Sequence, residues 1–310
     1  MHSPQAIQNA VLRFPCGLRQ PPETFRFSID ALLLAAFATN GLHSRAKDPT
    51  RPKAIRMADL GTGCGVVALA ALLAYPRMTA AGIELQPALV DAARHNAAML
   101  GLEGRFTVLH ADLAAPHWLH RFAPSADTCT TGEKTSHPSP SVHANALTDD
   151  MHVPQHKPSR ARHLLPPGGF DLVTANPPYR LPGTGRHPTS AQREAALFES
   201  HGTLQAFIRA AAQLLRSRGR FVCIFKAERL AELFETLRQS NLEPKRLRCV
   251  HARAGQDALL VLVEACRGAQ TALSVEPPLV LHNGTGPDTT LSAEAIAFCP
   301  FLARSTRAPA

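Results

Sequence analysis

The sequence predicts an open α/β fold: a mostly parallel sheet of six or seven strands, with helices on both faces and an antiparallel hairpin at one edge. Short apolar runs alternate with segments of helical periodicity through much of the 310 residues. Strands and helices that alternate in this way need crossover connections, which join parallel strands. The last two apolar runs are instead joined by a short link that contains glycine, and such a link favours a hairpin.

The individual elements follow from periodicity and end signals. The expected strands are residues 55–60, 78–85, 105–110, 170–175, 220–225, 247–251 and 258–264. The expected helices are residues 66–74, 87–100, 204–215 and 228–239. Pro87 suits a first helical turn, and Gly101 suits the cap that ends the same helix.

The expected organisation is an N-terminal segment (1–54), one α/β domain (55–300) and a tail (301–310). Residues 123–167 are rich in Pro, Ser, Thr and His and poor in large apolar groups, which predicts a disordered surface insertion in the domain. The insertion contains five histidines whose spacing matches no metal-ligand set, so no metal is expected: His137, His143, His152, His156 and His163.

Composition narrows the possible classes of protein. With 45% hydrophobic residues the chain can form a substantial core, and its net charge of +9 favours an approach to a polyanion such as RNA or DNA without requiring one. Seven scattered cysteines without a CxxC pair predict free thiols in a reducing compartment. No secretory signal or long apolar run is present, so we expect a soluble cytoplasmic protein, without a membrane partner and most simply a monomer.

A glycine-rich loop follows the first expected strand, in the segment DLGTGCG (59–65). Gly61, Gly63 and Gly65 allow the backbone to turn tightly and to approach a ligand without intervening Cβ atoms. Asp59 can accept from an ammonium group, whereas it would repel a pyrophosphate. The loop therefore predicts a nucleoside site, although a tight strand-to-helix turn without a ligand is the alternative interpretation.

Two further acidic residues follow the next strands. Glu84 ends the second strand, where a carboxylate can accept both ribose hydroxyls, and Asp112 follows the third strand within reach of an adenine amine. With Asp59 they suit a ligand that has an amino-acid tail, a ribose and an adenine. Simple surface or helix-end carboxylates are the alternative.

The segments ADLGTGCGVVALA, GIEL and HAD resemble the first three motifs of Rossmann-like methyltransferases that depend on S-adenosylmethionine (SAM). The resemblance implies SAM as the cofactor and the matching residues as its site: Asp59, Gly61, Gly63, Gly65, Glu84 and Asp112. It also implies that residues 1–54 cover this site.

The fourth expected strand ends in Asn176-Pro177-Pro178-Tyr179, at the sheet edge where such folds bind ligands. A planar exocyclic amine is a poor nucleophile because its lone pair is delocalised. Two acceptors, the Asn176 side-chain carbonyl and the Pro177 backbone carbonyl, would hold its N–H groups and expose the lone pair. Tyr179 offers a face on which a flat acceptor can stack. No general base is needed, since water can take the proton; a proline-rich strand exit without chemistry is the alternative.

The tetrapeptide NPPY resembles that of methyltransferases acting on adenine in DNA or RNA, or on glutamine in proteins. More specifically, PETFRFSIDALLLAAFA (22–38), NPPYRLPGTGRHPTSAQREAALFE (176–199) and EPPLVLHNGTG (276–286) resemble the bacterial valine-tRNA adenine-N6 methyltransferase family. That family modifies the purine beside the anticodon, and the resemblance implies tRNA as the partner. The insertion at 123–167 departs from the family pattern.

Several residues outside the motifs are also expected near the site. A predicted helix would cover the methionine end of SAM. Two phenylalanines and an aspartate lie before it or at its start: Phe25, Phe27 and Asp30. The arginines are expected to contact RNA phosphates, although each is individually typical of a solvated surface: Arg26, Arg180, Arg186 and Arg193.

The alternatives are a release-factor glutamine methyltransferase, an rRNA or DNA adenine or guanine amine methyltransferase, and a SAM-binding scaffold without activity. Release-factor enzymes carry a helical N-terminal domain, whereas about fifty residues rich in Pro and Arg precede Ile55. A DNA enzyme would need a recognition domain, and the insertion is too poor in apolar residues to form one. A scaffold would be expected to have a damaged NPPY motif.

Overall fold

The computed structural model describes residues 3–22, 24, 26–43, 54–115, 118–121, 165–178 and 204–305. Most of the predicted insertion (123–167) lies outside the described residues, but Leu165 to Pro167 do not. Leu165 is fully buried against the helices and strands that follow it. The packed core therefore includes a residue near the end of the expected insertion, five positions before the expected strand.

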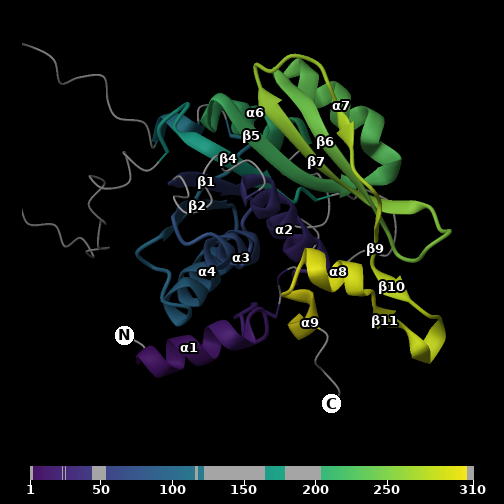
Figure 1. Ribbon diagram of the computed structural model, residues 1–310. Coiled ribbons are helices and arrows are strands. Elements are labelled where there is room, and N and C mark those ends of the chain that lie inside the picture. Colours follow the sequence, from purple (N-terminus) through teal and green to yellow (C-terminus); the bar gives the residue numbers. More distant parts are fainter. Residues whose placement is uncertain are drawn as a thin grey trace, which may run out of the picture.

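The order of the elements agrees with the sequence pattern (Figure 1). The first half contains α1 (Pro4–Arg13), α2 (Ile29–His43), β1 (Ile55–Leu60), α3 (Val66–Ala74), β2 (Met78–Glu84), α4 (Pro87–Met99), β3 (Phe106–His110) and the 3₁₀ turn η1 (Trp118–Arg121). The central part contains β4 (Phe170–Ala175), α6 (Leu204–Leu214), β5 (Leu215–Lys226), the 3₁₀ turn η3 (Ala227–Arg229), α7 (Leu230–Gln239), β6 (Leu242–His251) and β7 (Ala258–Arg267). The last part contains β8 (Ser274–Val275), β9 (Leu279–Val280), β10 (His282–Asn283), η4 (Gly286–Asp288), β11 (Thr290–Leu291), α8 (Ala293–Phe298) and α9 (Leu302–Ser305).

Nine strands of the described chain form one sheet in the order β3-β2-β1-β4-β5-β7-β6-β8, with β9 also paired to β6. Strands β1 to β5 are parallel, whereas β7 is antiparallel to both β5 and β6. The predicted fold class, a mostly parallel sheet with an antiparallel hairpin, is therefore confirmed. The seven long strands match the expected number, and the two-residue strands β8 and β9 were too short to give a period-two signal.

Strand β5 is longer than the sequence predicts, because it begins directly where α6 ends. Its register with β4 shifts between the pairs Phe170–Leu215 and Leu172–Arg220, so the first residues of β5 bulge out of the ladder. Arg218 adopts a left-handed φ of 60° in this bulge. Such a bulge has no apolar alternation, which is why only the second half of the strand was recognisable from the sequence.

Helices cover both faces of the sheet, as predicted. One face packs against α2, α3 and α4 together with the C-terminal α8 and α9, and the other packs against α6, α7 and η1. Figure 1 shows α6 and α7 on one side of the sheet and α2, α3 and α4 on the other. The central strand β1 is buried on both faces, which explains its nearly continuous apolar run.

Helix α2 is a core element rather than a surface helix. Leu32, Leu33, Leu34 and Phe37 are fully buried, and apolar residues occur around its whole circumference. A short helix of this kind is stable only when other elements surround it. The described residues of the N-terminal segment, 3–22, 24 and 26–43, therefore contribute to the same core as the rest of the chain, and α1 packs on α4.

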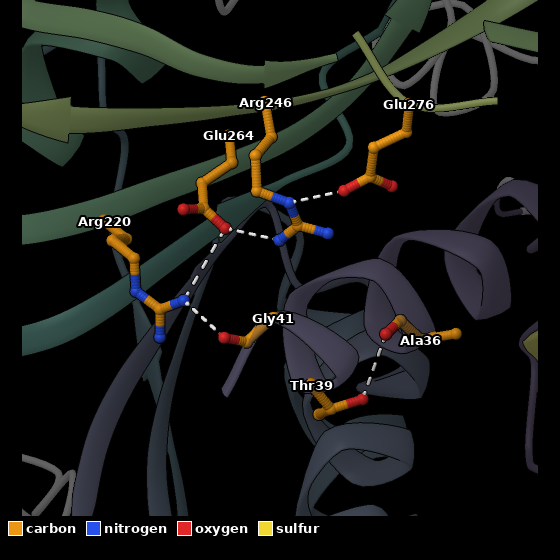
Figure 2. A network of polar contacts seen from close by, with 7 residues as sticks. All are labelled: Ala36, Thr39, Gly41, Arg220, Arg246, Glu264 and Glu276. Carbon is orange, nitrogen blue, oxygen red and sulfur yellow. Dashed lines mark hydrogen bonds and ion pairs between the residues drawn. The ribbon is translucent and has the colours of Figure 1, made fainter. Parts of the chain in front are cut away.

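A network of buried charges ties the end of α2 to the antiparallel hairpin (Figure 2). Arg246 donates to Glu264 at 2.8 Å and to Glu276 at 2.7 Å. Arg220 lies 3.5 Å from the same Glu264 oxygen and donates to the Gly41 carbonyl at 3.3 Å. Glu264 is fully buried, so removal of either arginine would leave a buried charge with too few partners, a change that typically costs about 3–5 kcal/mol.

Candidate functional site

The glycine-rich loop connects β1 to α3 and depends on all three of its glycines. Gly61, Gly63 and Gly65 have φ values of 63°, 58° and 90°, a region that other residues seldom adopt. A Cβ on Gly61 would lie 3.1 Å from the Phe207 ring, and one on Gly65 would lie 3.1 Å from the Phe106 ring. A Cβ on Gly63 would meet nothing within 4 Å. Gly61 and Gly65 thus allow close packing, whereas Gly63 borders open space where a ligand could approach the backbone.

Asp59 lies beneath this loop and is almost completely buried, with 1% of its surface exposed. The hydroxyl of Thr62 donates to one carboxylate oxygen at 2.6 Å, and that of Thr174 donates to the other at 2.7 Å. Burial raises the pKa of Asp59 from its usual 3.8 to about 6, although both hydroxyls and the Ala68 N–H act in the opposite direction. The carboxylate therefore connects the loop after β1 to strand β4.

Glu84, at the end of β2, is also buried. One carboxylate oxygen accepts from the Gly63 N–H at 2.8 Å, and the other accepts from the Gln86 N–H at 2.9 Å. Burial raises the pKa of Glu84 above its usual 4.5, while these N–H donors favour the charged form. Each carboxylate oxygen has a second lone pair, so both can still accept a hydroxyl from a ligand.

Strand register aligns the expected site residues along one edge of the sheet. Leu60 pairs with Ile83 and with Ala175, and Glu84 pairs with His110, so strands β3, β2, β1 and β4 end side by side. Since neighbouring strands lie about 4.8 Å apart, this edge is about 14 Å long from β3 to β4. It carries the ends of the four strands in the order Asp112, Glu84, Gly61, Asn176.

The two ends of this edge differ in character. Asp112 is half-buried and accepts from the Ala114 N–H at 2.8 Å, which closes the turn after β3. Asn176 is half-buried and Pro177 is buried directly after β4, so the strand delivers both to the edge. Pro178 is half-buried, and Tyr179 lies outside the described residues. The structure thus brings Asn176 and Pro177 next to the glycine loop, and the predicted stacking role of Tyr179 stays a prediction.

Asn96 is a further part of the site that the sequence analysis missed. It is fully buried on α4; its amide donates to the Cys64 carbonyl of the glycine loop at 2.9 Å and to the Arg19 carbonyl at 3.1 Å. Its oxygen accepts from the Arg19 N–H at 2.7 Å. Asn96 therefore holds the N-terminal segment against the loop. A polar residue at helical spacing among buried Leu89, Ala93 and Leu100 was the available signal.

Thr174 was missed for a comparable reason, since a single threonine in an apolar strand has many structural explanations. Cys64, within the loop, is buried; burial raises the pKa of its thiol to about 12, so it is protonated at neutral pH and unsuited to nucleophilic chemistry.

Of the other residues expected near the site, some lie outside the described residues: Phe25, Arg180, Arg186 and Arg193. Arg26 is exposed, whereas Phe27 is half-buried and packs against the core beside α2. Asp30 lies in the first turn of α2 and is half-buried. Within the described ranges no three His, Cys, Asp or Glu side chains form a group suited to a metal ion. The helices of that part are all too short or too polar to cross a membrane.

Comparisons with known proteins support the fold. No family model matches the chain. The chain is 25% identical over 264 residues to a tRNA1(Val) (adenine(37)-N6)-methyltransferase of Porphyromonas gingivalis, a match that covers 84% of this chain and 83% of that protein. It is 31% identical over 142 residues to a release factor glutamine methyltransferase of Deinococcus radiodurans, which covers 44% of this chain and 51% of the relative.

Among solved structures, a protein described as a predicted O-methyltransferase from Agrobacterium tumefaciens is similar with a TM-score of 0.56 and 20% identity. The match covers 88% of this chain and 96% of that structure. The fold is therefore that of the Rossmann-like methyltransferases, as the motifs predicted. The curated relatives that resemble the chain in sequence carry the names of two kinds of methyltransferase.

Proposed function

We propose that the chain is a SAM-dependent methyltransferase that acts on the exocyclic N6 amine of an adenine in RNA, most simply in tRNA beside the anticodon. The observation that carries the proposal is the alignment of Gly63, Glu84 and Asn176 at one sheet edge. The named relative that matches 84% of the chain acts on adenine in tRNA, and this supports the choice of acceptor.

The residues present fit SAM. Glu84 is already oriented by two backbone N–H donors and keeps a lone pair on each oxygen for the two ribose hydroxyls. Asp112 follows β3, the strand next to the one that ends at Glu84, and can accept from the adenine amine. When bound, SAM supplies an electrophilic methyl group on a sulfonium. Residues 18–22, which Asn96 holds to the loop through Arg19, would cover one side of the cofactor.

Asp59 would act on the cofactor ammonium mainly through its charge. Its exposed fraction is 1%, and both oxygens accept hydroxyls from Thr62 and Thr174, so a direct contact would require the loop to move. A negative charge in a buried region is weakly screened, and it therefore attracts a cation across the loop. The order of the acidic groups along the edge then orients the methionine end toward β4.

Asn176 and Pro177 would bind the acceptor amine. The Asn176 side-chain carbonyl and the Pro177 backbone carbonyl each accept one N–H, which favours a tetrahedral nitrogen and exposes its lone pair. The nitrogen forms a bond to the methyl carbon, and the sulfonium keeps the electron pair of the broken bond. The alkylated amine loses its extra proton to water. Buried Pro177 fixes the backbone so that its carbonyl direction is preset.

A second candidate is a protein-glutamine methyltransferase, because the amide of glutamine is also a planar nitrogen. One observation favours it: a relative with that name matches at 31% identity. That match covers 44% of the chain, whereas the match to the tRNA enzyme covers 84%. An rRNA or DNA amine as acceptor is a further alternative. An acceptor in tRNA would place the protein in the cytoplasm.

The test uses SAM with a labelled methyl group and three separate acceptors: total tRNA, rRNA and release factor. We expect label in tRNA, and we expect digestion to nucleosides followed by mass spectrometry to identify N6-methyladenosine. Label confined to release factor would contradict the RNA assignment, and label in none of them would contradict the proposed activity.

The Asn176→Ala variant tests the role of the strand end. Loss of one preorganised hydrogen-bonding group is expected to lower kcat by roughly 10²-fold or more while SAM affinity stays close to that of the wild type. Asn283→Ala, which changes an exposed asparagine of β10, is the matched control. Turnover within a few-fold of wild type in Asn176→Ala would rule out its proposed role.

A further inference from the structure

Cations gather at the edge of the sheet opposite the candidate site. Parallel strands that end at the site begin at this other edge, where β4, β5 and β6 start and β7 ends. Five basic side chains from separate segments lie near the ends of these strands and of α7, and we call them the basic edge: Arg216, Arg218, Arg238, Lys245 and Arg267.

Three of these cations have neutral partners. Arg218 donates to the Gly268 carbonyl at 3.4 Å, Lys245 donates to the Gln270 carbonyl at 3.1 Å, and Arg267 donates to the Leu215 carbonyl. None of the three has a carboxylate within ion-pair distance among the residues that the structure describes. A backbone carbonyl satisfies an N–H group but leaves the positive charge uncompensated.

The remaining two cations of the basic edge are paired. Arg216 binds Asp171 at 2.7 Å, and Arg238 binds Glu243 at 3.2 Å. Both pairs are solvent-exposed on the arginine side, with 44% and 59% of these side chains accessible, and exposed pairs are weak and screened by salt. The basic edge therefore carries a surplus of positive charge, which comes from Arg218, Lys245 and Arg267.

A groove on the α6 and α7 face lies beside the basic edge. It has a volume of about 440 Å³ and is lined by Gln205, Arg209, Gln213 and Gln239 among others. Gln213 and Gln239 lie next to Arg216 and Arg238 in the fold, since α6 and α7 both end at this edge. Glu235 is the nearby acidic residue, and it accepts from Gln239 at 3.1 Å. Amides and guanidinium groups are donors that suit phosphate and ribose oxygens.

From this we propose that the basic edge, with the adjoining groove, binds the sugar–phosphate backbone of the acceptor RNA at a distance from the methylated base. The proposal rests on the proposed function, since it takes the acceptor to be RNA. The six residues of β4 separate the two edges by about 20 Å, so an acceptor that contacts both must be at least that long. A folded tRNA meets this condition, whereas an RNA trinucleotide held at the site is too short to reach the basic edge.

The test compares Arg218→Gln/Lys245→Gln with a control that removes the same charge elsewhere, Arg13→Gln/Arg94→Gln on the exposed surfaces of α1 and α4. Fluorescence anisotropy would measure binding of full-length tRNA and of an adenine-containing RNA trinucleotide over a range of KCl concentrations. We expect the basic-edge variant to bind tRNA about tenfold less tightly. The slope of log Kd against log salt concentration should be smaller by about one to two. Trinucleotide affinity, SAM affinity and kcat at saturating tRNA should match those of the control.

The outcomes separate this proposal from the proposed function. Equal tRNA affinity in the two double variants would overturn the basic edge as an RNA-binding surface, as would an equal loss of affinity for the trinucleotide. Weaker methylation of release factor with unchanged tRNA binding would overturn it too. If wild-type protein binds tRNA through the basic edge but transfers no methyl group to RNA, the surface stands and the proposed function fails.

Discussion

Replacing Asp59 with asparagine is expected to stabilise the protein at neutral pH while weakening cofactor binding. Asp59 is buried beneath the glycine loop, and burial raises its pKa from 3.8 to about 6. The folded protein therefore holds this proton more tightly than the unfolded chain. Its contribution to stability is fully present below about pH 4 and is lost as the pH rises through about 6.

The magnitude follows from the pKa. A tenfold change in proton affinity corresponds to about 1.4 kcal/mol, so a rise from 3.8 to about 6 means that ionised Asp59 lowers the free energy of unfolding by about 3 kcal/mol at pH 8. Asparagine removes this charge and keeps a partner for each hydroxyl. Thr62 can donate to the amide oxygen, while Thr174 can rotate to accept from the amide N–H.

The assay is urea unfolding, followed by circular dichroism between about pH 4 and pH 8. The stability gain of Asp59→Asn over wild type should be small near pH 4, grow through pH 6 and level off above about pH 7. Calorimetry with SAM should show weaker binding in the variant at all pH values, and in wild type a loss of affinity as the pH falls below about 6. Asp91→Asn, at an exposed position on α4, should change neither quantity.

A gain in stability that does not vary with pH would refute this reasoning, because it would show that the ionisation of Asp59 does not lower the free energy of unfolding. Unchanged SAM affinity in Asp59→Asn would refute its electrostatic role in the site.

The remaining predictions concern the loop and the residue that holds it. Gly63→Ala should cost about 1–2 kcal/mol of stability for its left-handed φ and raise the Kd for SAM at least tenfold, because its Cβ enters the open space beside the loop. Gly65→Ala should lower the melting temperature more, because its Cβ also crowds the Phe106 ring, and should change SAM affinity less; the reverse order would show that the ligand lies elsewhere. Asn96→Ala and Leu100→Ala should both lower the free energy of unfolding by about 2–4 kcal/mol. Only Asn96→Ala should also raise the Kd for SAM. Equal Kd values in the two folded variants would show that Asn96 has a purely structural role.

The elements that position the site were predictable because their signals are local. The helix that starts at Pro87 and the strand that ends at Glu84 agree within about one residue with the expectation, since each depends on periodicity within one segment. The bulged start of β5 and the two-residue strands were not predictable. They have no periodicity, and long-range pairing decides their conformation.

The site was predictable in part. Glycines and acidic residues at strand ends follow from the rule that ligands of open α/β sheets bind at that edge. Thr174 and Asn96 were not found, because their partners lie 115 and 77 positions away in the sequence and no local pattern indicates such a contact.

The sequence by itself determined the fold class, the turn at the glycine loop and the set of polar groups at the strand ends, because each of these depends on neighbours along the chain. Tertiary structure alone decided that β7 lies between β5 and β6, that Asp59 is buried with a raised pKa, and that the basic edge exists. The physical reason is that burial and charge density depend on which distant segments come together. Arg218, Lys245 and Arg267 are ordinary surface cations in the sequence and become one charged surface only when the sheet brings their strands together.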